Sequence, residues 1–215
     1  VKLRPAPRPD PKKATPPAKT RKATKTRSKV PSHQTFAIPA HAPRIGPNSA
    51  PVKVVLFADF HCSFSRRIAP NFRKLGKDFG ADVQLVFLHY PLKALHPEAQ
   101  SLARLAAAAS RQGYFWQLFD HIYGMKSKLS TPSAMRRWLL KRRGGRKVNA
   151  ARLRKDKSAA IVAVAKDRAL GVKLKLRGTP TTFVNGWRVN GAVPYTKLRA
   201  VVERELNKKG SAVKD

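Results

Sequence analysis

Two uninterrupted apolar runs, and several stretches with helical spacing, mark out the folded part of the chain. Residues 52–57 and 83–88 are rich in Val, Leu and Phe, which predicts two strands buried on both faces. After the first run, apolar residues recur every three or four positions, which predicts an amphipathic helix over about 63–79. Further helices are expected over about 97–109, 114–123 and 131–140, then one ending near Gly171 and a last one over 195–206.

A hairpin is predicted near the C-terminus. Residues 181–184 and 187–189 are rich in β-branched and aromatic side chains and flank Asn185-Gly186, a pair that favours a two-residue turn. The order is strand, helix, strand, helical block, helix, strand, strand, helix, which is typical of an α/β domain with a helical insertion. We therefore expect one folded domain over 35–215, with the insertion at about 95–165.

The first 34 residues differ from the rest. They contain eleven Lys or Arg residues, one acid and seven prolines, with few large apolar side chains. Such a segment buries too little surface to offset the loss of chain entropy, so a disordered tail is expected over 1–34. It serves either as a solvated tether or as an arm that binds a polyanion.

The whole chain carries a formal charge of +35, from 46 Lys and Arg against 11 Asp and Glu. The tail over 1–34 supplies part of this excess, and residues 126–157 supply thirteen basic side chains against one acid. The charge either attracts a polyanion (nucleic acid, anionic lipid or an acidic polymer) or only keeps the protein soluble. No base-reading motif accompanies the basic runs, so binding through them is expected to be independent of nucleotide sequence.

The cysteine count and the hydropathy exclude several classes of protein. A single cysteine, Cys62, excludes an intramolecular disulfide, a CxxC pair and a multi-cysteine metal site. The histidines lack ligand spacing, so neither a metal nor a cofactor is expected. No apolar run approaches the roughly 18 residues that span a bilayer. From Val1 onward there is no charged and then apolar leader, so no signal peptide is expected in this sequence.

Cys62 follows the first predicted strand and begins the helix after it. There its sulfur lies beside unpaired backbone N–H groups and the positive end of the helix dipole, and both favour thiolate over thiol. Arg66 and Arg67 are expected to add electrostatic support within one turn. A lone cysteine is often only a small buried apolar residue, but this position favours a reactive thiol.

Several segments together resemble the DsbA-like thiol–disulfide oxidoreductases of the thioredoxin superfamily. Residues 59–70 read DFHCSFSRRIAP, which is similar to the start of the active-site helix in that family. Residues 177–186 read RGTPTTFVNG, similar to its cis-proline loop, and 96–99 with 113–116 resemble its inserted helical domain. The resemblance covers about 50–207 and implies a thioredoxin fold with a helical insertion. It also implies an extracytoplasmic setting, periplasmic or in the cell envelope.

The resemblance assigns roles to residues around Cys62. It implies a cis peptide bond between Thr179 and Pro180, with Thr179 presented beside the sulfur, where its backbone pairs with an extended substrate as an added strand. The alternative is an ordinary trans proline at the entry of a strand. The other residues expected in the substrate groove are His61, Ser63 and Phe64.

Two positions depart from the family pattern. Ser65 stands where the family has its second, resolving cysteine, and Leu56 stands where many members carry a buried carboxylate that assists proton transfer. Ser65 is expected to hydrogen-bond the Cys62 thiolate as part of the catalytic site. An engineered Cys-to-Ser change would explain Ser65 but not Leu56, which favours natural divergence.

Two functions fit these residues. The first is thiol–disulfide exchange through Cys62 alone, on a protein disulfide or with a glutathione-like thiol. With one sulfur, the mixed disulfide that Cys62 forms waits for an external thiol. The second is a redox-inactive thioredoxin-fold binding protein whose basic surface, residues 1–34 and 126–157, holds a polyanion. Reaction of Cys62 with oxidised glutathione in the folded protein discriminates between them.

Overall fold

The computed structural model describes three stretches of one compact unit that begins at Pro31. The described residues are 33–124, 131–141 and 148–211. The tail expected over 1–34 therefore lies outside them except for its last two residues. Two parts of the basic run also lie outside them, at 126–130 and 142–147.

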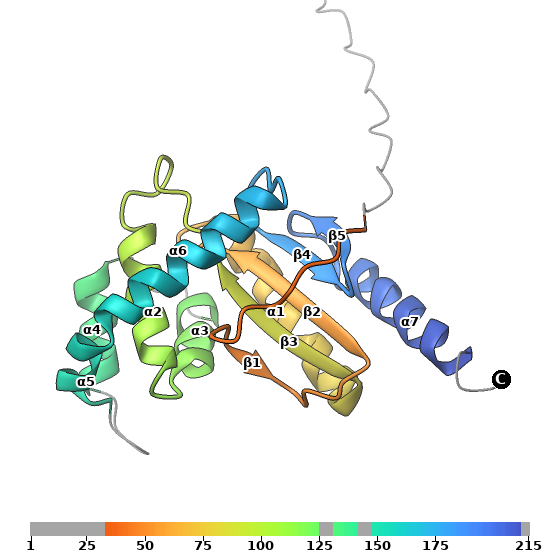
Figure 1. The fold of residues 1–215 in the computed structure, drawn as a ribbon, viewed down its shortest axis with the longest axis horizontal. Helices are drawn as coiled ribbons and strands as arrows, with labels where there is room; N and C mark the ends of the chain where they lie inside the picture. The colour runs from red at the N-terminus through yellow and green to blue at the C-terminus, as the bar shows by residue number, and fades with distance from the viewer. Residues whose placement is uncertain (1–32, 125–130, 142–147, 212–215) are drawn as a thin grey trace, which may run out of the picture. The chain divides into compact units, whose positions relative to one another are not determined.

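A mixed sheet of five strands, in the order β1-β3-β2-β4-β5, forms the centre of this unit (Figure 1). β2 and β3 run parallel at its middle and are almost wholly buried, as their apolar runs predict. All other neighbouring strands pair antiparallel. The strands are β1 (Arg44–Ile45), β2 (Val52–Ala58), β3 (Val83–His89), β4 (Thr181–Val184) and β5 (Trp187–Asn190).

Seven α-helices and one short 3-10 helix are found among the described residues. They are α1 (Ser63–Asp78), η1 (Gly80–Asp82), α2 (Ala99–Ser110), α3 (Phe115–Gly124), α4 (Pro132–Lys141), α5 (Ala150–Lys155), α6 (Lys157–Lys173) and α7 (Tyr195–Ser211). Helices α2 to α6 lie between β3 and β4 in the chain.

The core divides between the two faces of the sheet because side chains alternate along each strand. Leu56 and Phe87 belong to the larger cluster, which includes the buried side of α1 and α7. Phe57 and Phe183 belong to the smaller cluster, which is completed by the end of α6 and by the segment 36–42. Full burial of one such side chain stabilises the fold by about 1.5–3 kcal/mol.

The elements predicted from the sequence agree with the structure to within a few residues. Asn185 and Gly186 have positive φ angles of 44° and 86°, the geometry of the two-residue turn that this pair predicted. Three short elements were not predicted: β1 with two residues, η1 with three and α5 with six. The α/β thioredoxin-like fold with a helical insertion is confirmed.

Candidate active site

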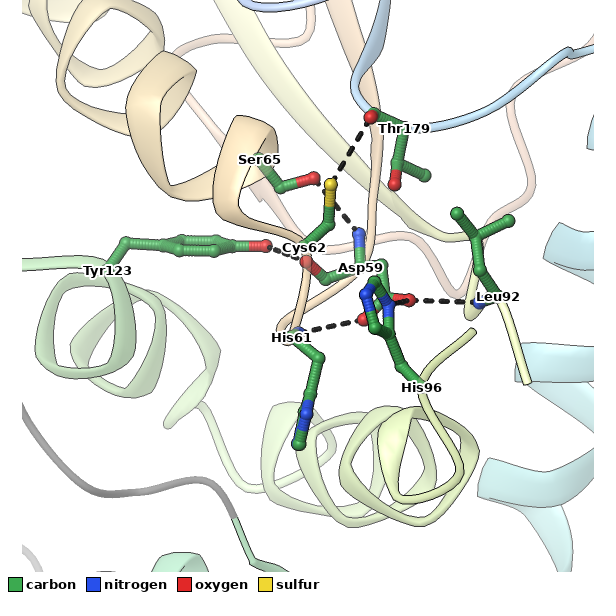
Figure 2. Close-up of polar contacts among 8 residues, drawn as sticks. All are labelled: Asp59, His61, Cys62, Ser65, Leu92, His96, Tyr123 and Thr179. Carbon is green, nitrogen blue, oxygen red and sulfur yellow. Dashed lines mark hydrogen bonds and ion pairs between the residues drawn. The ribbon is translucent and has the colours of Figure 1, made fainter. Parts of the chain in front are cut away.

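Cys62 occupies the N-cap position of α1. Its backbone is extended (φ −70°, ψ 120°), and its N–H donates to the carbonyl oxygen of Asp59 at 3.1 Å. The side chain is only 6 % exposed, and its thiol donates to the carbonyl oxygen of Thr179 at 3.3 Å (Figure 2). The sulfur thus lies at the helix start, as the sequence predicted, and just beneath the surface.

The loop that meets Cys62 comes from a segment 117 residues further along the chain. The peptide bond between Thr179 and Pro180 is cis, as the resemblance implied. Strand β4 begins at the next residue, and its pairing of Thr181 with Phe57 of β2 carries the loop to the end of β2. The Thr179 hydroxyl is buried and has no hydrogen-bond partner among the described residues.

Ser65 is fully buried, one turn into α1. Its hydroxyl oxygen accepts a hydrogen bond from the backbone N–H of Asp59 at 3.4 Å, whereas a bond to the sulfur was expected. The hydroxyl of Tyr123 donates to the carbonyl oxygen of Asp59 at 3.1 Å. Burial raises the pKa of Tyr123 well above its usual value of 10.0, so the phenol stays a donor. Ser65 and Tyr123 therefore hold the loop before Cys62 from two sides.

The Asp59 side chain organises the same loop. It is fully buried, and its carboxylate accepts three hydrogen bonds, from the backbone N–H groups of His61 at 2.8 Å and Leu92 at 2.9 Å and from Nδ1 of His96 at 2.8 Å. Figure 2 shows the sulfur pointing toward Thr179, while the His61 and His96 rings lie on the other side of the loop. The sequence pattern alone assigned no role to Asp59 or His96. The available signal was an acid directly after a buried strand and three residues before the cysteine.

The remaining expected site residues lie around the helix start. Ser63 and Phe64 are exposed, Phe64 to 52 %. Arg67 lies over the Phe64 ring, 5.7 Å from its centroid, and Arg66 donates through Nη1 to the carbonyl oxygen of Ile122 at 2.8 Å. The Arg66 guanidinium is thus bound to the end of α3. Leu56 is fully buried in β2 and contributes packing.

A second buried carboxylate lies on α6, beside the end of β3. Asp167 accepts from Nε2 of His41 at 2.7 Å and from the backbone N–H of His89 at 2.9 Å. Neither ring nitrogen of His89 has a hydrogen-bond partner among the described residues. Burial lowers the pKa of His89 to about 4, so its ring is neutral near neutral pH. The sequence did not predict this cluster.

The described residues show neither of two other features, a metal-ligand cluster and a membrane-spanning helix. In the described stretches, no group of three or more His, Cys, Asp or Glu side chains is arranged to hold a metal ion. The helices of the same stretches include none that is long and apolar enough to cross a bilayer.

The chain is similar to several known proteins. It is 34 % identical over 170 residues to the Na(+)/H(+) antiporter NhaA 3 of Salinispora tropica, a match that covers 73 % of this chain and 24 % of the antiporter. It spans about a quarter of that relative's length. It is also 30 % identical over 173 residues to the probable disulfide bond formation protein D of Bacillus anthracis, covering 76 % of this chain and 78 % of that protein.

Two solved structures share the fold. A thioredoxin-like oxidoreductase from Silicibacter pomeroyi superposes with a TM-score of 0.67 at 27 % identity, covering 79 % of this chain and 94 % of that one. A periplasmic thioredoxin-like protein from Salmonella enterica superposes with a TM-score of 0.65 at 21 % identity, covering 78 % and 91 %.

A family model also matches the part of the chain that carries the site. The model of the DSBA-like thioredoxin domain matches residues 53–203, which include β2, the Cys62 helix start, the helical insertion and the cis-proline loop. The chain therefore belongs to the DsbA-like thioredoxin-domain family of thiol–disulfide oxidoreductases.

Proposed function

We propose that this protein performs thiol–disulfide exchange with Cys62 as its one reacting sulfur. The contact between Sγ and the Thr179 carbonyl oxygen, 3.3 Å away at the start of α1, carries the proposal. It supports exchange because a disulfide substrate aligned on the backbone of Thr179 has its sulfur next to that of Cys62. The unpaired N–H groups of the first helical turn stabilise negative charge on the attacking sulfur.

The reaction needs no cofactor. The Cys62 thiol gives its proton to solvent, and the thiolate attacks one sulfur of a disulfide. The substrate S–S bond breaks, a mixed disulfide forms with Cys62, and the other substrate sulfur leaves as a thiolate that takes up a proton. Because Ser65 has no thiol, a second, external thiol attacks the mixed disulfide and regenerates Cys62.

The surface around the site supports an extended peptide as the substrate. Phe64 and Leu95 are large apolar side chains that are 52 % and 72 % exposed. Leu95 precedes His96, the partner of Asp59, and Phe64 follows Cys62 by two residues. Together with the backbone of Thr179 beside the sulfur, these side chains offer apolar contact and main-chain hydrogen bonding to an added strand.

Mass spectrometry of the full chain after incubation with oxidised glutathione tests the proposal. The expected result is one adduct per chain, mapped to Cys62 and removed by reduced glutathione. Cys62→Ala should give no adduct, whereas Ser65→Ala should give the same adduct as the unchanged protein. If the adduct forms only after denaturation, the thiol is inert in the fold, and the redox-inactive binding role replaces this proposal.

The family also suggests partners and a setting. The Bacillus anthracis relative is called a disulfide bond formation protein, and one structural neighbour is periplasmic. We extend both to this chain: its substrates are protein disulfides, and it works outside the cytoplasm, where disulfides persist.

A second candidate role, polyanion binding, is favoured by the exposure of basic side chains. In the described parts of 126–157, four exposed arginines lie on α4 and α5: Arg136, Arg137, Arg152 and Arg154. Arg152 pairs with Asp156, the one acid of this run, at 3.7 Å. We propose that this run and the tail over 1–34 together bind a polyanion through charge alone. Retention on heparin should fall steeply with salt, and deletion of 1–34 should lower it. If the full chain and the deletion elute from heparin at the same salt concentration, the tail takes no part in polyanion binding.

A further inference from the structure

The outward face of α6 is apolar from Val162 to Val172. Val162 and Val172 are 51 % and 54 % exposed, and Ala165 and Ala169 between them are exposed too. At 100° per residue these four positions form one stripe about 80° wide and about 15 Å long. Figure 1 shows α6 on the side of the molecule nearest the viewer. We call this stripe with its flanking basic residues the α6 face.

Basic side chains border the stripe on both sides. The same helical geometry places Lys166 and Lys173 along one edge and Lys157 and Arg168 along the other, and all four are exposed. The only acid of α6, Asp167, is fully buried and accepts from His41 and from the His89 N–H. The α6 face therefore presents positive charge with no carboxylate of its own helix to offset it.

A hollow widens the apolar surface beside Val162. It has a volume of about 290 Å³ and lies between α6 and α2. Ala107, Ala159 and Ala163 are among its wall residues, and Lys166 also lines it. Apolar wall and cation again lie side by side, as along the stripe.

We propose that the α6 face is a docking surface for a bilayer that contains anionic lipids. Shallow burial of the valines between the headgroups, together with attraction of the flanking cations to those headgroups, is how amphipathic helices bind membranes in the interfacial plane. A nucleic acid would use the four cations but would gain little from exposed Val162 and Val172, because its binding is driven by phosphate contacts. The stripe thus favours lipid over nucleic acid.

Docking would hold the active-site loop close to the membrane. Six residues lead from Lys173, at the end of α6, to Thr179. An extended chain of that length spans at most about 20 Å, so the Thr179 loop stays within that distance of the docked helix end. The docking surface itself does not depend on the chemistry proposed for Cys62.

Vesicle sedimentation of the full chain tests this surface. Vesicles of phosphatidylcholine alone are compared with vesicles in which phosphatidylglycerol replaces part of it, and heparin retention is measured in parallel. Val162→Ser with Val172→Ser should lower binding to the anionic vesicles several-fold and leave heparin retention unchanged. Lys166→Gln with Lys173→Gln should lower vesicle binding about five-fold for each charge removed.

A charge-matched control lies elsewhere on the fold. Lys77 of α1 and Lys197 of α7 are exposed, and their double Gln variant removes the same charge as the Lys166 and Lys173 pair. It should lower vesicle binding much less, and unchanged far-UV circular dichroism melts should show that all variants are folded. Equal loss in both lysine pairs, or unchanged binding by the valine variant, would overturn the proposal in favour of general polyanion binding. Loss on deletion of 1–34 with no effect of the α6 variants would overturn it in favour of the tail.

Discussion

Replacing Asp59 by Asn should loosen the loop that carries Cys62. The Asp59 carboxylate has no exposed surface and accepts hydrogen bonds from three donors at 2.8–2.9 Å, two of them on the segment between β3 and α2. An amide keeps one acceptor oxygen and replaces the other by an NH₂ group, so at least one donor then faces another donor. The other contacts of Asp59 are made by its backbone and stay in place.

The expected cost follows from these contacts. A hydrogen bond to a charged group contributes about 1.5–3 kcal/mol, and a buried donor left unsatisfied adds a desolvation cost. We therefore expect Asp59→Asn to lower the free energy of unfolding by about 2–4 kcal/mol. For a domain of this size that corresponds to a fall in Tm of roughly 5–15 °C.

Urea denaturation and thermal melts measure this cost, with Asp120→Asn as the matched control. Asp120 pairs with Arg73 at 2.9 Å but is 50 % exposed, so the same substitution there should cost less than about 1 kcal/mol. A second readout is alkylation of Cys62 below the unfolding transition. It should be slower in Asp59→Asn than in the unchanged protein, because a looser loop no longer holds the sulfur beside the helix N–H groups that stabilise its thiolate. Equal stability of the two variants would refute the assignment of Asp59 as the residue that holds the loop.

Three further variants test other parts of the account. Ser65→Cys should form a disulfide with Cys62 and show a reversible two-electron couple in a glutathione titration, because the i, i+3 spacing at a helix start brings two sulfurs together. Burial lowers the pKa of His89 to about 4 in the fold, below the unfolded value of 6.5. As the pH drops from about 6.5 to 4, the unfolded chain therefore binds a proton that the folded protein does not, and the free energy of unfolding falls. Between about pH 7.5 and pH 5, His89 should therefore lower the free energy of unfolding by about 2 kcal/mol, and this loss should be absent in His89→Phe. Gly171→Ala should destabilise by about 1–3 kcal/mol despite the better helix propensity of Ala, because its Cβ would lie 2.4 Å from the Tyr90 ring.

Each of these variants has a control or a contrary result. If the two thiols of Ser65→Cys form no disulfide in oxidising buffer, the helix start has diverged from the family geometry. An unchanged pH dependence of stability in His89→Phe would mean that this ring takes up its proton in the fold as readily as in the unfolded chain. Gly124→Ala is the control for Gly171→Ala. A Cβ at Gly124 meets no atom of the described residues within 4 Å, so that change should be neutral or stabilising. A stabilising Gly171→Ala would contradict the close packing of α6 on Tyr90.

Local patterns were sufficient for most of the fold. The apolar runs of β2 and β3 predicted buried strands, and the Asn185-Gly186 pair predicted its turn, because each depends on neighbouring residues alone. Strand β1 has two residues and forms only by pairing with Val86 and Leu85 of β3, so it has no pattern of its own. Helix α5 lies in a very basic segment and has only six residues, too few for a helical periodicity to be recognised.

The position of the reacting sulfur could be predicted from the sequence, but the residues that hold the loop before it could not. The position of Cys62 after a strand and at a helix start follows from local sequence, as does the resemblance of the Pro180 loop. The supporting contacts join distant segments: Asp59 and His96 are 37 residues apart, and Asp59 and Tyr123 are 64 apart. Such pairs are decided by how the insertion packs on the sheet. The contact between the Asp59 N–H and the Ser65 hydroxyl oxygen was not predicted, and the hydrogen bond from Ser65 to the thiolate stays a prediction.

The rate at which Cys62 reacts with a small disulfide, in the folded protein and in the urea-unfolded chain, tests the central claim most directly. The sulfur is only 6 % exposed, so an inert buried thiol would react far more slowly when folded than when unfolded. A thiol activated at the start of α1 should react faster when folded, despite its burial, because the helix N–H groups stabilise its thiolate. A folded-state rate above the unfolded-state rate is the result we predict. A folded-state rate well below it would contradict the assignment of Cys62 as a working nucleophile.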